Sequence, residues 1–172
     1  SVTFVSAFAG GTVRDILIER RPFFWVENTE YIWLLIALVL AAPLLLRSRE
    51  HRVTDKVMEV ADALGLGLFT ISGVSLALVA GMPPIVAVLL GSITAVFGGV
   101  TRDVLCNEIP KVYRDHQPYT LCTLIGGVVF LGLNHLAVSP HLSSLVSICC
   151  ISGLRLLAVT YQWQIPSWPR NS

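Results

Sequence analysis

Two copies of one charged motif occur in this sequence. Residues 10–17, Gly-Gly-Thr-Val-Arg-Asp-Ile-Leu, return 88 residues later as Gly-Gly-Val-Thr-Arg-Asp-Val-Leu at residues 98–105. The same offset relates Tyr31 to Tyr119, and a proline follows each copy. A single motif of this kind would be weak evidence, but two copies in register across flanking positions indicate an internal repeat.

The charges of the repeat need a physical explanation, because both copies lie in apolar segments. An Arg or Asp near the middle of a membrane costs about 2.5–3.5 kcal/mol on insertion scales. The side chains that must therefore be paired, hydrated or close to a helix end are Arg14, Asp15, Arg102 and Asp103. We expect both pairs to converge on a pseudo-twofold axis and to line an ion or solute path. The alternative is that each Arg snorkels to an interface and pairs with its neighbouring Asp, which fixes a helix end.

Glycine pairs stand just before these charges. Gly10 and Gly11 precede the first Arg-Asp, and Gly98 and Gly99 precede the second. Each glycine lowers helix propensity by about 1 kcal/mol relative to alanine, so two in succession predict a kink or a break. An opened helix exposes carbonyls that can line a polar path. The four glycines are therefore predicted to kink or break the two motif helices.

Two further charges lie inside apolar segments. Asp62 is near one end of its segment, where we expect water to reach it, and it is a candidate for the same path. Arg155 is either a path residue or an anchor between helices. The cysteines and histidines show no metal-binding spacing, and the sequence holds no nucleophile–base pair or nucleotide motif. We therefore predict neither a metal site, nor a cofactor, nor an enzyme.

Composition indicates that these residues lie in a lipid bilayer. Of the 172 residues, 54% are hydrophobic and 13% are charged, whereas soluble domains have roughly 25% charged residues. Apolar segments lie near residues 1–18, 31–46, 57–81, 84–106, 118–135 and 140–162. They lack the alternation of a barrel, so the predicted fold class is an all-α integral membrane protein. A net charge of +1 without a basic stripe excludes nucleic acid as a partner.

The chain is predicted to form a single transmembrane domain over residues 1–172. An offset of 88 residues crosses three apolar segments, so the two motif copies run through the membrane in opposite directions, as in an inverted-topology repeat. The predicted units are a partial first repeat at 1–50, the second repeat at 55–136 and an extra C-terminal helix at 139–163. The counterpart of segment 57–81 falls before Ser1, so we expect seven spans, the first of them upstream.

The distribution of Lys and Arg predicts the orientation. Seven of these residues fall on the side that holds segment 47–56 and the C-terminus, and two fall on the other side. The side richer in Lys and Arg faces the cytoplasm, so the C-terminus is expected there.

The paired motifs, with Phe-Phe-Trp-Val after the first copy and Cys-Asn-Glu-Ile-Pro after the second, resemble the prokaryotic trimeric intracellular cation (TRIC) channels. That family overlaps a group of small bacterial membrane proteins, some of which are described as glycine transporters. The resemblance implies two inverted three-helix repeats plus a last helix, in a homotrimer of the prokaryotic inner or plasma membrane. It also implies a potassium-conducting pore in each protomer, formed by the glycine-kinked segments 1–18 and 84–106.

The predicted function is a passive channel for monovalent cations, with potassium as the permeant ion. The alternative is a secondary transporter for a small zwitterion such as glycine, for which kinked helices in inverted repeats are equally suited. Both need a hydrated path at the membrane midplane. In a channel the gates at the two ends of the path can be open together, whereas in a transporter they cannot.

Replacing Gly98 and Gly99 by Ala is expected to stiffen the second motif helix by about 1 kcal/mol per site and to shift the open probability. Single-channel recording of the reconstituted protein measures this shift. Unchanged conductance and gating would mean that the two glycines serve packing only.

Overall fold

The computed structural model describes residues 2–46, 51–110, 112 and 118–163, and in that part of the chain all regular structure is helical. The helices are α1 (Val2–Leu17), α2 (Phe24–Glu27), α3 (Glu30–Leu46), α4 (His51–Val79), α5 (Pro84–Leu105), α7 (Tyr119–His135) and α8 (Pro140–Thr160). Each apolar segment of the sequence corresponds to one of the longer helices, which confirms the all-α fold class. The short helix α2 was not predicted.

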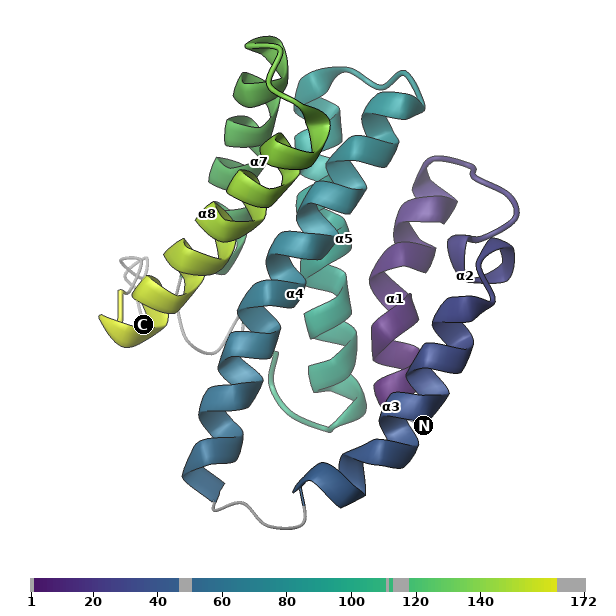
Figure 1. The fold of residues 1–172 in the computed structure, drawn as a ribbon, viewed down its shortest axis with the longest axis vertical. Coiled ribbons are helices and arrows are strands. Elements are labelled where there is room, and N and C mark those ends of the chain that lie inside the picture. Colours follow the sequence, from purple (N-terminus) through teal and green to yellow (C-terminus); the bar gives the residue numbers. More distant parts are fainter. Residues whose placement is uncertain (1, 47–50, 111, 113–117, 164–172) are drawn as a thin grey trace, which may run out of the picture.

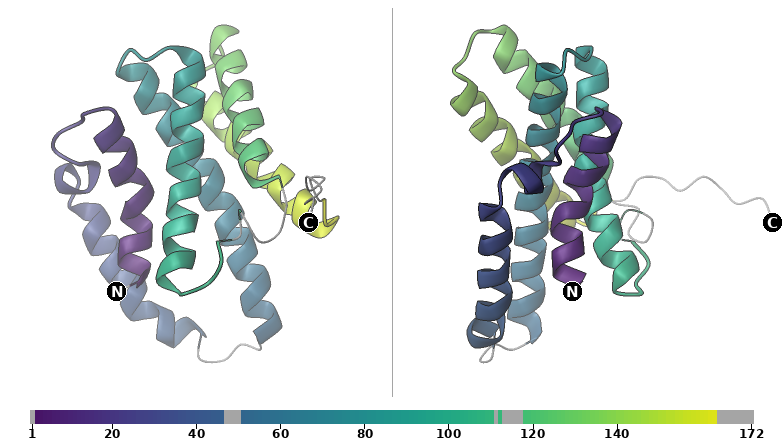
Figure 2. Two further views of the ribbon diagram at one scale, coloured as in Figure 1. Left: turned by 180° about the vertical axis from the view of Figure 1, so that it is seen from behind. Right: turned by 90° about the vertical axis from the view of Figure 1, so that its right-hand side faces the viewer.

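The helices α4 and α5 form the centre of the bundle (Figure 1). They pack against each other, and seen from behind, α5 lies between α1 and α7 (Figure 2). Helix α8 packs on α4 and α7, and α3 lies at one edge. The core side chains of this arrangement include Leu66, Ile71, Val74, Leu90, Phe130 and Ile151.

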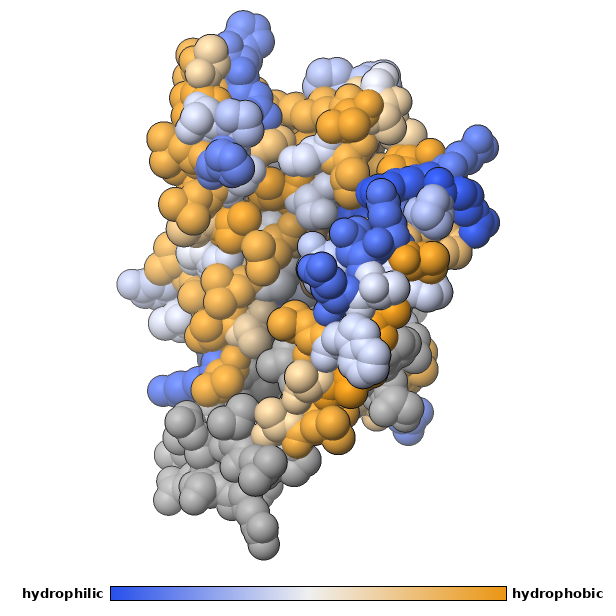
Figure 3. All heavy atoms as spheres, turned by 45° about the vertical axis from the view of Figure 1, so that its right-hand side comes forward, coloured by the Kyte–Doolittle hydropathy of each residue, from blue (hydrophilic) through white to orange (hydrophobic). Residues whose placement is uncertain are grey.

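The outer surface is apolar as well. Large hydrophobic side chains such as Trp33, Leu40, Ile85 and Leu145 are exposed. Figure 3 shows apolar side chains over much of one face, with hydrophilic ones gathered at the connection between α1 and α3. An apolar surface of this extent indicates contact with lipid. By length and composition, three of the described helices can cross a membrane, namely Glu59–Val79 within α4, α5 and α8, and α7 is a shorter apolar helix.

Glycines let α4 and α5 approach to backbone contact. A Cβ atom added to Gly73 would lie 2.7 Å from the Cα of Gly91. A Cβ added to Gly91 would lie 2.5 Å from the carbonyl oxygen of Thr70. Small residues at such positions are what allow close helix packing in membranes, where apolar burial alone gives no advantage.

The motif helices α1 and α5 lie side by side and run in opposite directions (Figure 1). The two helices also end with the same backbone conformation, at positions that are 88 residues apart. Glu19 and Asn107 adopt positive φ angles of 55° and 57°. The next N–H in each copy donates to the carbonyl of Asp15 (2.8 Å) or Asp103 (2.9 Å), which closes a Schellman cap. The two motif copies are therefore equivalent in geometry as well as in sequence. The span expected upstream of Ser1 stays a prediction.

Neither glycine pair breaks its helix. Both α1 and α5 continue through their Gly-Gly sequences without interruption. Gly10 instead brings α1 against α5, since an added Cβ would run into the carbonyl oxygen of Thr94, and Gly11 leaves room for the ring of Phe24. Packing between helices compensates for low helix propensity, which is why the predicted break is absent. The kinks at Gly10, Gly11, Gly98 and Gly99 stay a prediction.

The orientation also stays a prediction. The C-terminus and most of the basic residues that were counted, including Arg47, Lys111 and Arg170, lie outside the described residues.

Gly91→Ala is expected to lower the free energy of unfolding by about 1–3 kcal/mol, the usual scale of overpacking, because its Cβ would meet the α4 backbone. Gly132→Ala is the matched control, since nothing lies within 4 Å of a Cβ added there. Thermal unfolding of the purified protein in detergent measures both variants. Equal melting temperatures for the two would contradict the close α4–α5 contact.

Candidate functional site

Arg14 and Asp15 form a buried pair near the end of α1, with exposed fractions of 3% and 0%. The Nε of Arg14 donates to Oδ1 of Asp15 at 2.9 Å, and its Nη2 lies 2.8 Å from the same oxygen. Its Nη1 donates to the Oγ of Ser72 on α4 at 3.1 Å. All three guanidinium nitrogens therefore have an oxygen partner. We call these two residues the α1-end pair.

The short helix α2 covers the α1-end pair. The N–H of Phe24 donates to Oδ2 of Asp15 at 2.7 Å, and the ring centroid of Phe24 lies 5.3 Å from the guanidinium carbon of Arg14. The indole Nε1 of Trp25 donates to the Oγ1 of Thr12 at 3.3 Å. Asp15 thus neutralises Arg14 and also fixes the chain that turns back over α1.

Arg102 and Asp103, the α5-end pair, repeat this geometry. Nε of Arg102 donates to Oδ1 of Asp103 at 2.9 Å, and Nη2 lies 2.8 Å from that oxygen. Nη1 again reaches α4, where it donates to Oδ1 of Asp62 at 2.9 Å. The structure therefore joins three of the predicted site residues. The difference between the ends is the α4 partner, a carboxylate here and a hydroxyl at the other end.

Tyr119 and Arg155 extend the α5-end site. The hydroxyl of Tyr119 lies 3.4 Å from Oδ2 of Asp62. The guanidinium carbon of Arg155, on α8, lies 4.7 Å from the ring centroid of Tyr119. Both side chains are buried, at 5% and 4% exposed. Tyr119 was not among the site residues predicted from the sequence. The sequence feature that could have indicated it is its match with Tyr31 at the 88-residue offset.

The two pairs do not converge. The end of α1 and the end of α5 lie at opposite ends of the bundle (Figure 1), because antiparallel motif helices carry equivalent residues to opposite ends. The expectation of a joint site on the pseudo-twofold axis is therefore wrong. Both sites instead contact α4, through Ser72 and Asp62, whose positions are about 15 Å apart along the helix.

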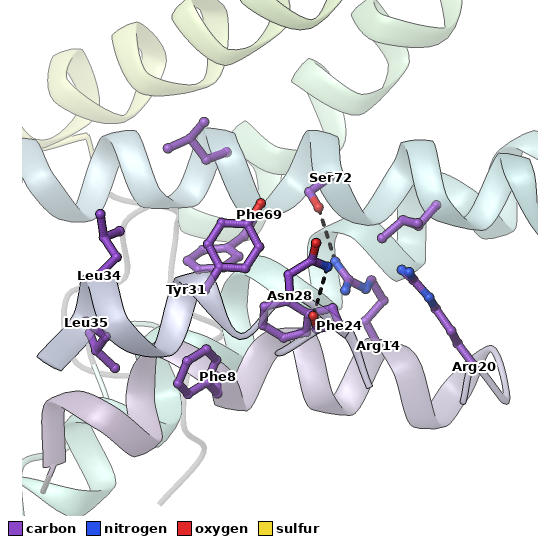
Figure 4. Close-up of a pocket in the computed structure, with 13 residues that line it drawn as sticks. Phe8, Arg14, Arg20, Phe24, Asn28, Tyr31, Leu34, Leu35, Phe69 and Ser72 are labelled. Atoms are coloured by element: carbon purple, nitrogen blue, oxygen red, sulfur yellow. Dashed lines mark hydrogen bonds between the residues drawn. The ribbon is translucent and has the colours of Figure 1, made fainter. Parts of the chain in front are cut away.

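A cavity of about 620 Å³ lies between α1, α3 and α4. Its lining runs from Leu34 and Leu35 at one end to Arg14 and Arg20 at the other (Figure 4). Most of the lining side chains are apolar, and among the described residues the guanidinium groups of Arg14 and Arg20 are the charged groups that line it.

Among the described residues, no group of three or more His, Cys, Asp or Glu side chains is placed to hold a metal ion. All four cysteines are free thiols.

Long apolar helices, a lipid-facing surface and ion pairs buried between helices define an integral membrane protein. The sequence profile of the glycine transporter family matches residues 1–47 and 59–135, more than half of the chain. A UPF0126 membrane protein of Vibrio cholerae is 34% identical over 164 residues, 95% of this chain and 68% of that protein. The inner membrane protein YadS of Escherichia coli K12 is 33% identical over 166 residues, 95% of this chain and 79% of that protein.

The chain belongs to the glycine transporter family, and its fold is similar to that of the solved TRIC channels. The TRIC orthologue from Rhodobacter sphaeroides superposes with a TM-score of 0.83 at 28% identity, over 92% of this chain and 80% of that chain. A TRIC structure solved to explain conductance gives a TM-score of 0.82 at 31% identity, over 98% and 82%. The family predicted from the doubled motif is thereby confirmed.

Asp15→Ala is expected to lower the free energy of unfolding by about 3–5 kcal/mol, because it leaves Arg14 buried without its counter-charge. Ser72→Ala, the control at the same site, removes one of three contacts and should cost about 1 kcal/mol. Thermal unfolding in detergent compares the two variants with the unmodified protein. If Asp15→Ala proved no less stable than Ser72→Ala, the buried pair would not fix the end of α1.

Proposed function

We propose that this protein is a passive channel for monovalent cations, potassium among them, with one path inside each protomer of a homotrimer. The observation that carries the proposal is the likeness to solved TRIC cation channels over more than nine tenths of the chain at 28–31% identity. The R. sphaeroides relative is described as a trimeric cation channel. The apolar outer surface is available for contact between protomers as well as with lipid.

The charge arrangement is compatible with cation passage. An unpaired guanidinium would repel potassium, but Arg14 and Arg102 are each held by a carboxylate. At the α5 end, Asp62 and Asp103 balance the charges of Arg102 and of Arg155 beside Tyr119, so these four side chains together carry a formal charge of zero. A site without excess positive charge does not repel a cation.

We place the path along the contact of α1 with α5. In this conformation the two backbones meet where Gly10 faces Thr94, so the path is closed there. Conduction then requires α1 and α5 to separate, and a Gly-Gly pair allows a helix to bend at low cost. Gly10, Gly11, Gly98 and Gly99 are therefore proposed as the positions that bend on opening, with Arg14, Asp15, Arg102, Asp103 and Asp62 as the pore charges. The C-terminus is proposed to face the cytoplasm.

A transporter of a small zwitterion such as glycine is the second candidate. It is favoured by the description of the matching family, glycine transporter. Antiparallel motif helices suit alternating access as well as they suit a channel.

Single-channel recording of the reconstituted protein separates the two candidates. We expect unitary potassium currents far above the ~10³ events per second that a catalytic or conformational cycle usually reaches. Saturable glycine uptake into vesicles without such currents would favour the transporter.

Arg102→Gln tests the pore charges. We expect an altered conductance or voltage dependence, since moving one charge through the full potential is worth about 2.3 kcal/mol per 100 mV. Arg20→Gln is the matched control, because Arg20 pairs with Glu27 at the surface. If Arg102→Gln and Arg20→Gln both behave like the unmodified protein, the α5-end pair is a structural anchor and the path lies elsewhere.

A further inference from the structure

The short helix α2 contacts α1 before and at the glycine pair of residues 10–11. The ring centroid of Phe8 lies 5.7 Å from that of Phe24 and 6.1 Å from that of Trp25, which are distances at which aromatic rings attract each other. At the pair itself, the ring of Phe24 takes the place of a side chain, since a Cβ added to Gly11 would run into it. Figure 4 shows both phenylalanine rings beside α1.

The same short helix also contacts α1 beyond the glycine pair. The N–H of Phe24 donates to Oδ2 of Asp15 at 2.7 Å, and Nε1 of Trp25 donates to Oγ1 of Thr12 at 3.3 Å. The hydroxyl of Thr12 donates in turn to the carbonyl oxygen of Phe8 at 2.8 Å. One chain of hydrogen bonds thus joins the indole to both sides of the pair. A threonine that bonds back to the carbonyl four residues earlier tends to bend a helix, so this bond and the glycines weaken the same segment of α1.

The second copy of the motif has different residues at these positions. At the 88-residue offset, Phe8, Thr12 and Phe24 correspond to Val96, Val100 and Val112. A valine offers neither a ring that can stack nor a hydroxyl that can accept a hydrogen bond. The contacts that bracket the glycine pair of α1 therefore cannot form in the same way around the glycine pair of α5.

We propose that α2 is a splint that keeps α1 straight at its glycine pair, and that the second copy of the motif does not repeat this device. The inference rests on the proposed function, in which both glycine pairs bend when the path opens. A bend at residues 10–11 moves Phe8 relative to Thr12 and Asp15, and α2 cannot then keep its contacts with all three. Helix α1 therefore bends only when α2 releases it, whereas the bending of α5 does not depend on α2.

Hydrogen–deuterium exchange of the reconstituted protein tests the splint without relying on current, because amide exchange reports local opening. Trp25→Phe keeps a ring and removes the N–H donor, so the amides of residues 10–17 are expected to exchange about fivefold faster, the scale of one net hydrogen bond. Phe24→Leu keeps the backbone N–H and removes the ring, and is expected to act in the same direction. Trp33→Phe is the matched control, because Trp33 is 70% exposed on α3. Residues 98–105 are the internal reference and should keep their exchange rate in every variant.

Unchanged exchange of residues 10–17 in both Trp25→Phe and Phe24→Leu would overturn the proposal. So would an equal acceleration of residues 10–17 and 98–105, because the whole bundle would then have loosened. In single-channel recordings, the same two variants should raise the open probability, and faster exchange with an unchanged open probability would overturn the role of the α1 bend in opening. An absence of cation current from every variant and from the unmodified protein would refute the channel function, while the exchange rates would still decide whether α2 holds α1 straight.

Discussion

A charge buried among apolar helices must have its counter-charge beside it, and this requirement shapes the structure. Arg14 and Arg102 each direct two nitrogens to the aspartate that follows and the third to α4. The adjacent aspartate is a partner available within the helix itself, and the partner on α4 is available only when the helices have packed. The same contacts that make the charges tolerable therefore also fix α1 and α5 against α4.

The two ends of the bundle are equivalent in motif and unequal in surroundings. The caps, the φ angles and the Arg–Asp distances agree between the copies. The α4 helix breaks the equivalence, since it offers a hydroxyl to one arginine and a carboxylate to the other. The two arginines therefore meet α4 in different electrostatic surroundings, one beside a neutral hydroxyl and one beside a second carboxylate.

Much of the fold could be predicted from the sequence, because hydrophobic segment length and the doubled motif are local signals. The helices, the family and the grouping of Asp62 with Arg102 and Asp103 follow from them. Contacts between distant segments could not be predicted in the same way. Ser72 is 58 residues from Arg14, and nothing in its own surroundings in the sequence marks it as a partner. The glycine pairs were ambiguous for a related reason, since low helix propensity predicts a break and close packing removes it.

The contact between Gly73 and Gly91 has a mechanical consequence. Because Gly73 and Gly91 bring the two backbones into contact, this point would be the fulcrum of any change in the angle between α4 and α5. Ser72 is adjacent to it, whereas Asp62 lies about 16 Å away along α4. A tilt of roughly 5° about the fulcrum would move Asp62 by about 1.4 Å and leave Ser72 almost in place. An increase of that size in the 2.9 Å distance between Arg102 Nη1 and Asp62 Oδ1 would exceed hydrogen-bonding range. A change in the angle between α4 and α5 would therefore act on the bond between Asp62 and Arg102.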